Sequence, residues 1–412
     1  MEFESHKKIF KRTFKFSRYK ITKQKTSGNH FRGVECPEPR SGHRIVVLDG
    51  NVYTFGGYTP IAEGGSVNHL LFKQLWRYNV AARCWKLLES TGEIPEELAS
   101  HSAALLGSYM LVYGGTGLPF GETSSNSVHI CNLNTLEWSK LDTEGTKPDE
   151  MYGQAMIIHD NKAYVCGGTT GYSYSMDVHC LDVKTKIWTN LDGKNDSERP
   201  PSRYRHEIAF HKDRIYVFGG GTAFDSYDFK EVPFFDLTTS SWNKVAPSVE
   251  FLEPRRCHGC VQVELVSFKF IICLAPYVYI CGGFDGTRCF SDIWKFDLNT
   301  HQWKKLSVKL PTPLYFHSVF VTNEGQLFVF GGVDSIENNS RTNTLYSMWL
   351  KIPSLSQMAW QAMLNYTPHI ARIDKNILNL ITTVIKFLPV ACIFMAIKTL
   401  PALAVAPSIG VM

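Results

Sequence analysis

The sequence lacks the short motifs that mark common soluble enzymes. It contains no phosphate-binding loop, no nucleophile elbow and no paired His–Glu metal motif. The first 33 residues have no continuous apolar core, so we expect no secretory signal peptide. The 11 cysteines, an odd number, are then expected to be reduced thiols in the cytoplasm or the nucleus. Together these absences favour a non-catalytic protein that needs no cofactor.

Most of the chain also lacks an excess of basic charge. The net charge is +5, but residues 1–33 hold ten Lys and Arg against two Glu, so that segment carries +8 and the remainder −3. A nucleic-acid surface needs a basic patch on the folded domain, so we expect no nucleic acid as a partner. The 44% hydrophobic content allows a sizeable core, and 31 Gly, 26 Phe and 18 Tyr favour short strands and tight turns in an all-β fold.

Long apolar runs are scarce, with one exception near the C-terminus. The run ILNLITTVIKFLPVACIFMAI begins at Ile377 and is 21 residues long, but Lys386 and Pro389 lie near its middle. A central Lys costs about 2.5–3.5 kcal/mol on membrane insertion, so we do not expect this run to span a membrane. Three interpretations of the hydrophobic tail, residues 376–412, stay open: partner-binding helices, a tail anchor and a mis-predicted terminal exon.

A repeat near 50 residues organises the rest of the chain. Its signature is a Gly-Gly pair after a short apolar run, with spacings of 58, 53, 52, 63 and 49 residues between successive pairs. The pairs stand at Gly56–Gly57, Gly114–Gly115, Gly167–Gly168, Gly219–Gly220, Gly282–Gly283 and Gly331–Gly332. A repeat of this length predicts a solenoid or propeller, in which each unit buries its faces against its neighbours.

Two further residue types recur in register with the glycines. A tryptophan follows the second strand of five repeats, at Trp85, Trp138, Trp188, Trp242 and Trp303. An anchor residue precedes most pairs by about 13 residues, at His43, His101, Gln154, His206, His258 and His317. We expect the tryptophans to fill the space between adjacent blades and the anchor histidines to be hydrogen-bonded structural groups.

These residues resemble the kelch-repeat family, and the resemblance implies a six-bladed kelch β-propeller at residues 36–352. Residues 1–35 form a basic segment in which TFKFSRYKI (Thr13–Ile21) alternates apolar and polar residues. It either supplies the closing strand of the last blade or is a disordered arm. Blade five carries an apolar insertion near residues 264–276, which is expected to bulge from the blade, to replace part of a strand, or to be a gene-model artefact.

Basic and aromatic residues gather in the loops that precede the anchor positions. These loops lie at one end of a propeller channel, where guanidinium groups beside aromatic walls can bind a carboxylate. The candidate peptide-binding residues are Tyr152, Arg203, Tyr204, Arg205, Arg255, Arg256, Tyr315 and Phe316. Rim charges that only hold adjacent loops are the alternative. Cys257 and Cys260 form a C-x-x-C sequence without a second ligand pair, so we expect no metal or redox role for them.

After blade six the pattern becomes helical, over residues 353–375. Ser354, Leu355, Met358, Ala359 and Met363 resemble the box that binds Elongin C, although Ala359 stands where the motif has Cys. Kelch proteins with this arrangement are substrate receptors of cullin-2 RING ubiquitin ligases. The resemblance implies Elongin B/C and cullin-2 subunits as partners, and recognition of protein C-termini that end in glycine. A generic kelch interaction scaffold, cytoskeletal or signalling, is the alternative.

Overall fold

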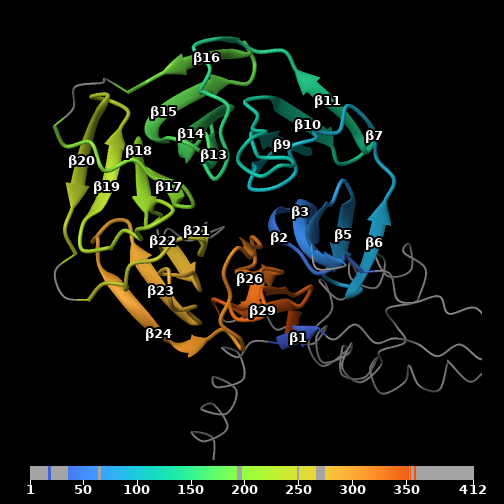
Figure 1. Cartoon of the computed structure of the whole chain (residues 1–412). Helices are drawn as coiled ribbons and strands as arrows, with labels where there is room; N and C mark the ends of the chain where they lie inside the picture. Colours follow the sequence, from blue (N-terminus) through green and yellow to red (C-terminus); the bar gives the residue numbers. More distant parts are fainter. Residues whose placement is uncertain are drawn as a thin grey trace, which may run out of the picture.

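The structure is a computed structural model of the 412-residue chain. It describes residues 17–19, 36–63, 66–192, 197–247, 250–265, 274–351, 353 and 357–358. The described part contains six mainly antiparallel sheets, arranged as blades in a circle (Figure 1). The predicted six-bladed all-β propeller is thereby confirmed.

Each blade runs from an innermost strand to an outer one. Blade one has β2 (Ser41–Leu48), β3 (Asn51–Glu63), β5 (Leu75–Asn79) and β6 (Cys84–Leu88), with β4 (Ser66–Leu71) paired to β3. Blade two has β8 (Ser102–Leu106), β9 (Tyr109–Tyr113), β10 (Val128–Asn132), β11 (Glu137–Leu141) and the added β7 (Thr91–Gly92). Blade three has β13 (Ala155–His159), β14 (Lys162–Thr169), β15 (Tyr174–Asp182), β16 (Ile187–Asn190) and β12 (Glu144–Gly145).

The second half of the circle follows the same plan. Blade four has β17 (Glu207–His211), β18 (Arg214–Phe218), β19 (Val232–Asp236) and β20 (Ser241–Val245). Blade five has β21 (Gly259–Leu265), β22 (Leu274–Cys281), β23 (Asp292–Asp297) and β24 (Trp303–Lys309). Blade six has β25 (Ser318–Val321), β26 (Gln326–Phe330), β29 (Leu345–Trp349) and β1 (Ser17–Tyr19), with the small pair β27 (Val333–Ser335) and β28 (Ser340–Arg341) beside it.

The first glycine of each pair makes room for the anchor residue of the next blade. At Gly56, φ is +70°, and an added Cβ would lie 2.5 Å from Cε1 of His101 and 2.5 Å from the carbonyl oxygen of Leu98. Gly331 of blade six bears the same relation to His43 of blade one, where an added Cβ would lie 2.5 Å from the ring. Only a residue without a side chain permits both this backbone conformation and this approach. The residues of the Gly-Gly and anchor signature therefore form the contacts between adjacent blades.

The tryptophans lie between blades, as predicted. The ring centroid of Trp138 in blade two lies 4.5 Å from that of Phe55 in blade one. Trp85 of blade one lies 5.0 Å from Phe330 of blade six, so the contact crosses the seam where the circle closes. Trp138 is 1% exposed. Burying a ring of this size removes roughly 150–250 Å² of surface from water, which makes these positions main sources of interblade stability.

Strands from the N-terminal and C-terminal parts of the chain pair in blade six. β1 pairs antiparallel with β29, with Arg18 opposite Tyr346 (Figure 1). This three-residue strand lies inside the stretch Thr13–Ile21, for which the sequence leaves a closing strand and a disordered arm as alternatives, and its pairing is that of a closing strand. Pairing of β1 with β29 covers the outer edge of a blade that the C-terminal part of the chain leaves with three strands, which reduces the risk of edge-to-edge association.

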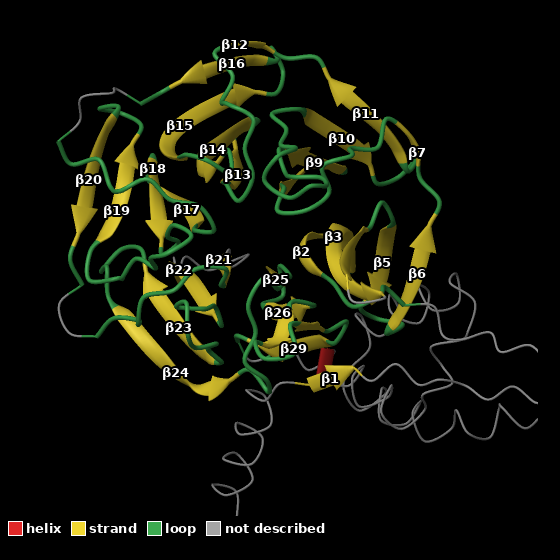
Figure 2. Cartoon of the chain, viewed as in Figure 1, coloured by secondary structure: helices red, strands yellow, loops and turns green. Residues whose placement is uncertain are grey.

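Two predicted features lie partly outside the described residues. The insertion of blade five continues β21 and β22, whose last described pair is Leu265 with Leu274, and a register shift follows Val263. In the C-terminal extension, Gln357 and Met358 are helical (Figure 2). Ser354, Leu355, Ala359, Met363 and the tail 376–412 lie outside the described residues. Among the residues that are described, no helix is long and apolar enough to cross a membrane.

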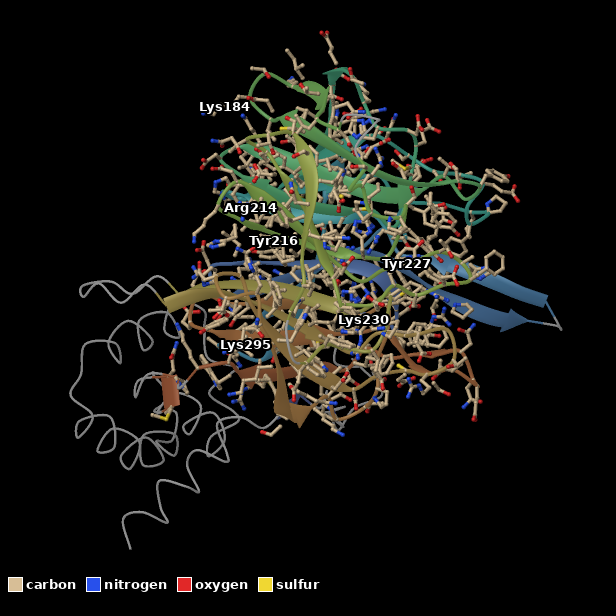
Figure 3. The ribbon with its side chains drawn as sticks, turned by 90° about the vertical axis from the view of Figure 1, so that its left-hand side faces the viewer. Lys184, Arg214, Tyr216, Tyr227, Lys230 and Lys295 are labelled. Atoms are coloured by element: carbon tan, nitrogen blue, oxygen red, sulfur yellow. The ribbon has the colours of Figure 1, made fainter. Side chains whose placement is uncertain are left out.

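The two faces of the propeller differ. The β3–β4 hairpin projects from one face, which also carries the loops that follow the Gly-Gly pairs; Tyr227 of one such loop points to that side (Figure 3). Arg214 and Lys295 lie toward the opposite side (Figure 3). We call the face with the hairpin the rim face. The predicted binding residues precede the anchors and therefore belong to the rim face.

Candidate binding pocket in the channel

Six residues, each directly before an anchor, form a closed ring of backbone hydrogen bonds around the channel. Each amide donates to the carbonyl oxygen of the equivalent residue in the preceding blade, over 2.7–3.2 Å. The ring runs through Gly42, Ser100, Gly153, Arg205, Cys257 and Phe316, and back to Gly42. All six have positive φ, from +55° at Phe316 to +68° at Gly153. This backbone conformation is rare for residues other than glycine, and the ring of bonds stabilises it.

Arg205 carries the one charged side chain of this ring. Its Cζ lies 4.3 Å from the ring centroid of Phe316, 5.5 Å from that of Tyr204 and 6.0 Å from that of Tyr152. Within the described part of the chain its buried Nε has no hydrogen-bond partner. Three aromatic faces hold the guanidinium by cation–π attraction, which does not use its N–H donors. An unpaired, partly buried guanidinium of this kind is a ready site for an anion.

Two other predicted arginines face the protein interior. Arg203 is 4% exposed, and it donates from Nε to the carbonyl oxygen of Pro201 and from Nη1 to that of Gly219. Arg255 is fully buried; its Nη1 donates to the carbonyl oxygen of Gly282 and lies 2.6 Å from Oδ1 of Asp292. Both guanidinium groups therefore tie a loop to the Gly-Gly pair of their own blade. Neither lines the channel pocket.

Arg256 differs both from Arg205 and from the interior arginines, because its guanidinium binds a neighbouring loop. Its Nη1 donates to the carbonyl oxygen of Asp225 at 3.1 Å and to the Ser226 hydroxyl at 2.8 Å, and its Nη2 donates to the carbonyl oxygen of Ala223 at 3.4 Å. These bonds fix the loop of blade four between Gly220 and β19. Arg256 thus holds a loop of the rim face in place, and its Nη1 and Nη2 are already bound to acceptors of that loop.

The predicted aromatic residues form the wall around Arg205. Tyr152 and Tyr204 stand at 83° to each other with centroids 6.3 Å apart. Tyr315 stacks on Phe284 at 4.9 Å and touches Phe316 at 5.3 Å. These rings come from blades three to six. They lower the local dielectric around Arg205, which strengthens its attraction for a ligand carboxylate.

The floor of the pocket is an ion pair that sequence reasoning did not anticipate. Arg44 of blade one and Glu207 of blade four occupy equivalent positions, one residue after the anchor, in blades that face each other across the channel. Nη1 of Arg44 lies 2.8 Å from Oε1 of Glu207, and Nε of Arg44 donates to the carbonyl oxygen of His101. The pocket is lined by Gly42, His43, Arg44, Ser100, Arg205, Glu207, Cys257, His258, Phe316 and His317. A comparison of the residues after the anchors, as well as those before them, would have found the pair.

The anchor side chains are buried and uncharged. Nε2 of His43 lies 3.2 Å from the carbonyl oxygen of Phe330, and Nε2 of Gln154 donates to the carbonyl oxygen of Tyr113. Burial lowers the pKa of His101 and of His206 to about 3. The anchors are thus neutral structural groups at physiological pH. Burial also raises the pKa of the Cys257 thiol to about 11, which keeps this pocket thiol protonated.

Exposed apolar side chains lie in four of the loops that follow the Gly-Gly pairs. Phe224 is 91% exposed and Tyr172 is 86% exposed, in blades four and three. Leu118 of blade two and Ile336 of blade six are also exposed. The loop of Phe224 is well fixed, because Tyr174 accepts a hydrogen bond from the amide of Ala223. Apolar side chains on a held loop, around a pocket with a free cation, are typical of a protein-binding face.

The repeats, the interblade glycines and this face define a kelch-repeat protein, whose propeller is typically a non-catalytic interaction scaffold. The sequence profile of the KLHDC2/KLHL20/DRC7 Kelch-repeats domain matches residues 61–273, and that of the Kelch motif matches residues 272–307.

Similarity to individual proteins is more specific. The chain is 43% identical to kelch domain-containing protein 10 of Homo sapiens over 353 residues, which cover 84% of this chain and 77% of the human one. It is 42% identical to the protein of the same name from Rattus norvegicus over 355 residues, 84% of each chain. The Drosophila melanogaster homolog is 34% identical over 393 residues, 89% of this chain and 63% of the fly protein. The chain belongs to the kelch domain-containing protein 10 family.

Proposed function

We propose that this protein is the substrate-recognition subunit of a cullin-2 RING ubiquitin ligase. In this proposal the channel pocket binds the C-termini of substrate proteins that end in glycine. The extension after blade six binds Elongin B/C, and partner subunits carry out ubiquitin transfer in the cytoplasm or the nucleus. The protein contributes proximity between substrate and transferase rather than a chemical group.

One observation supports the substrate half of the proposal: the guanidinium of Arg205 at the channel pocket, whose Nε has no hydrogen-bond partner among the described residues. The C-terminus is the one part of a polypeptide backbone that carries a carboxylate, and a guanidinium binds a carboxylate with two parallel hydrogen bonds. A narrow pocket lined by residues of five blades also accepts a chain end more easily than an internal segment, which would have to enter as a loop. The exposed Phe224 and Tyr172 offer further contacts to residues upstream of the terminus.

The ligase half rests on the sequence of the extension. Met358 lies in the described helical stretch and is half-buried. Ser354, Leu355, Ala359 and Met363 complete the resemblance to an Elongin C-binding box. An amphipathic helix with apolar residues three and four positions apart suits a groove on a partner protein.

Two measurements on the full chain test the two halves separately. The first is co-purification of the wild-type chain and of a Leu355→Asp variant with Elongin B/C. We expect the wild type to retain the complex and the variant to lose it, while both still bind the same peptides. The second is the affinity for glycine-ended peptides with a free or an amidated terminus, where we expect binding of the free carboxylate alone.

The alternative function, a kelch scaffold without a ligase, predicts a different pair of results. Such a protein would not retain Elongin B/C, and it would use the exposed rim residues to bind an internal surface of its partner. Equal binding of free and amidated peptides would reject the proposed carboxylate pocket. A wild-type chain that does not hold Elongin B/C would reject the ligase role.

A further inference from the structure

The Arg44–Glu207 ion pair stands out because of its position in the repeat. The other four blades carry short side chains one residue after the anchor: Ser102, Ala155, Gly259 and Ser318. Two of these, Ser102 and Ser318, donate their hydroxyl groups to backbone carbonyls of the following blade. Long side chains therefore occur at two of six equivalent positions, and the two lie in opposite blades and meet at 2.8 Å.

The Arg44 end of this pair is held by two partners. The Arg44 guanidinium is bound on one side by the carbonyl oxygen of His101 in blade two and on the other by the Glu207 carboxylate. The two side chains are 26% and 21% exposed, so the pair is shielded from solvent over most of its surface. A shielded pair fixed by an additional hydrogen bond is more rigid than a surface ion pair.

We propose that the Arg44–Glu207 pair determines the specificity of the pocket by setting its depth. The pair lies across the channel one step below Arg205, so a ligand terminus held by Arg205 has no space beneath it for a large side chain. The pocket then selects polypeptides whose last residue has a small side chain or none. This inference rests on the proposed binding of protein C-termini and assigns the selection among termini to two residues outside the predicted site.

The pair also sets the charge of the pocket. Arg44, Arg205 and Glu207 are the charged residues among those that line it. Since Glu207 neutralises Arg44, one positive charge remains, and it lies at Arg205 where the aromatic wall is densest. A ligand carboxylate is drawn to the neck of the channel rather than to its floor.

The test is a binding measurement with short synthetic peptides that differ only in the last residue: Gly, Ala, Val or Leu. The variants are Arg44→Ala with Glu207→Ala, which removes the pair without leaving one charge alone, and Arg44→Glu with Glu207→Arg, which rebuilds it with exchanged partners. The control is Arg214→Ala with Asp236→Asn, which removes an ion pair of blade four outside the pocket. Thermal unfolding of each variant checks that the propeller is folded.

We expect the double-alanine variant to bind the Leu-ended peptide more tightly, so that the preference for Gly over Leu narrows by about tenfold. The exchanged pair should recover much of that preference, and the control should keep the wild-type ratio. An unchanged ratio in the folded double-alanine variant, with Gly-ended peptides still bound, would overturn the inference and leave the proposed function standing. If the wild type bound none of the peptides, the proposed function would fall together with it.

Discussion

The guanidinium of Arg205 lies 4.3 Å from the ring centroid of Phe316, although the two residues belong to blades four and six. Their backbones are also linked, because Cys257 donates to Arg205 and Phe316 donates to Cys257 in the ring of hydrogen bonds. Phe316 of blade six thus contacts Arg205, the one cation of this ring, across blade five. The contact places a cation and an apolar surface on the same side of the pocket.

The first prediction compares two arginines two residues apart. Replacing Arg205 by Ala should weaken binding of a glycine-ended peptide by about 1.5–3 kcal/mol, the usual value for charge-assisted hydrogen bonds, with little change in thermal stability. Replacing Arg203 by Ala should lower stability, because the buried carbonyl oxygen of Gly219 and the partly buried one of Pro201 lose their donor. Isothermal titration and thermal unfolding of both variants measure these effects. Loss of binding without loss of stability in the Arg203 variant would contradict the assignment.

The second prediction concerns Phe316. A Phe316→Leu variant keeps an apolar side chain at a position with φ of +55° but removes the aromatic face. Peptide affinity should fall by about 0.5–2 kcal/mol, the range of a cation–π contact. Phe316→Tyr preserves the face and is the matched control. Equal affinities for all three proteins would show that the ring does not position Arg205.

The third prediction compares two glycines of blade one with the same backbone conformation. Gly50 has φ of +69° with nothing within 4 Å of an added Cβ, whereas the same atom at Gly56, with φ of +70°, would meet His101 and the carbonyl oxygen of Leu98 at 2.5 Å. Gly50→Ala should cost about 1 kcal/mol of stability from backbone strain alone. Gly56→Ala should cost several times more. Similar unfolding midpoints for the two variants would argue against close contact at the interblade position.

The fourth prediction is acid sensitivity of the propeller. The anchors His101, His206 and His317 have folded-state pKa values of about 3, 3 and 4, all lowered by burial. In the unfolded chain each titrates near 6.5, so below that pH the unfolded state binds more protons and stability falls. Each anchor then lowers the free energy of unfolding by up to about 1.4 kcal/mol for each pH unit between 6.5 and its folded pKa.

Thermal unfolding between pH 7.5 and 5 measures this dependence. A His206→Gln variant copies the residue that blade three carries at Gln154. It should reduce the slope of the unfolding midpoint against pH by the contribution of one histidine. The wild-type midpoint should drop steadily as the pH falls from about 6.5. A midpoint that is constant or rises over this range would contradict neutral, buried anchors.

The sequence predicts the fold well because single residues that recur in the repeats make the contacts between blades. Gly56 and His101 lie in different repeats, but both recur at a fixed spacing, so the repeat itself carries the contact. The candidate binding residues do not recur from repeat to repeat. Whether an arginine near the anchor points into the channel depends on its offset by one or two residues and on a local φ, +58° at Arg205. A list of rim arginines therefore mixes Arg205 with the interior Arg203.

The ion pair on the pocket floor likewise does not recur from repeat to repeat. Arg44 and Glu207 are 163 residues apart in the chain and have no spacing in common with a known motif. They meet because blades one and four are opposite in a circle of six. Their pairing follows from the number of blades, and it becomes predictable once equivalent positions of all blades are compared around the circle.

The closed ring of backbone hydrogen bonds, and with it the pocket, can form only after the last blade has been synthesised. Its members run from Gly42 to Phe316, so the first and last blades both contribute, and the bond from Gly42 to Phe316 completes it. A chain that has emerged from the ribosome only as far as blade five has several complete sheets but neither Phe316 nor the closing bond. Under the proposed function, such an intermediate would not yet bind a protein terminus, and opening of the seam between blades six and one would release a bound terminus without any change at Arg205.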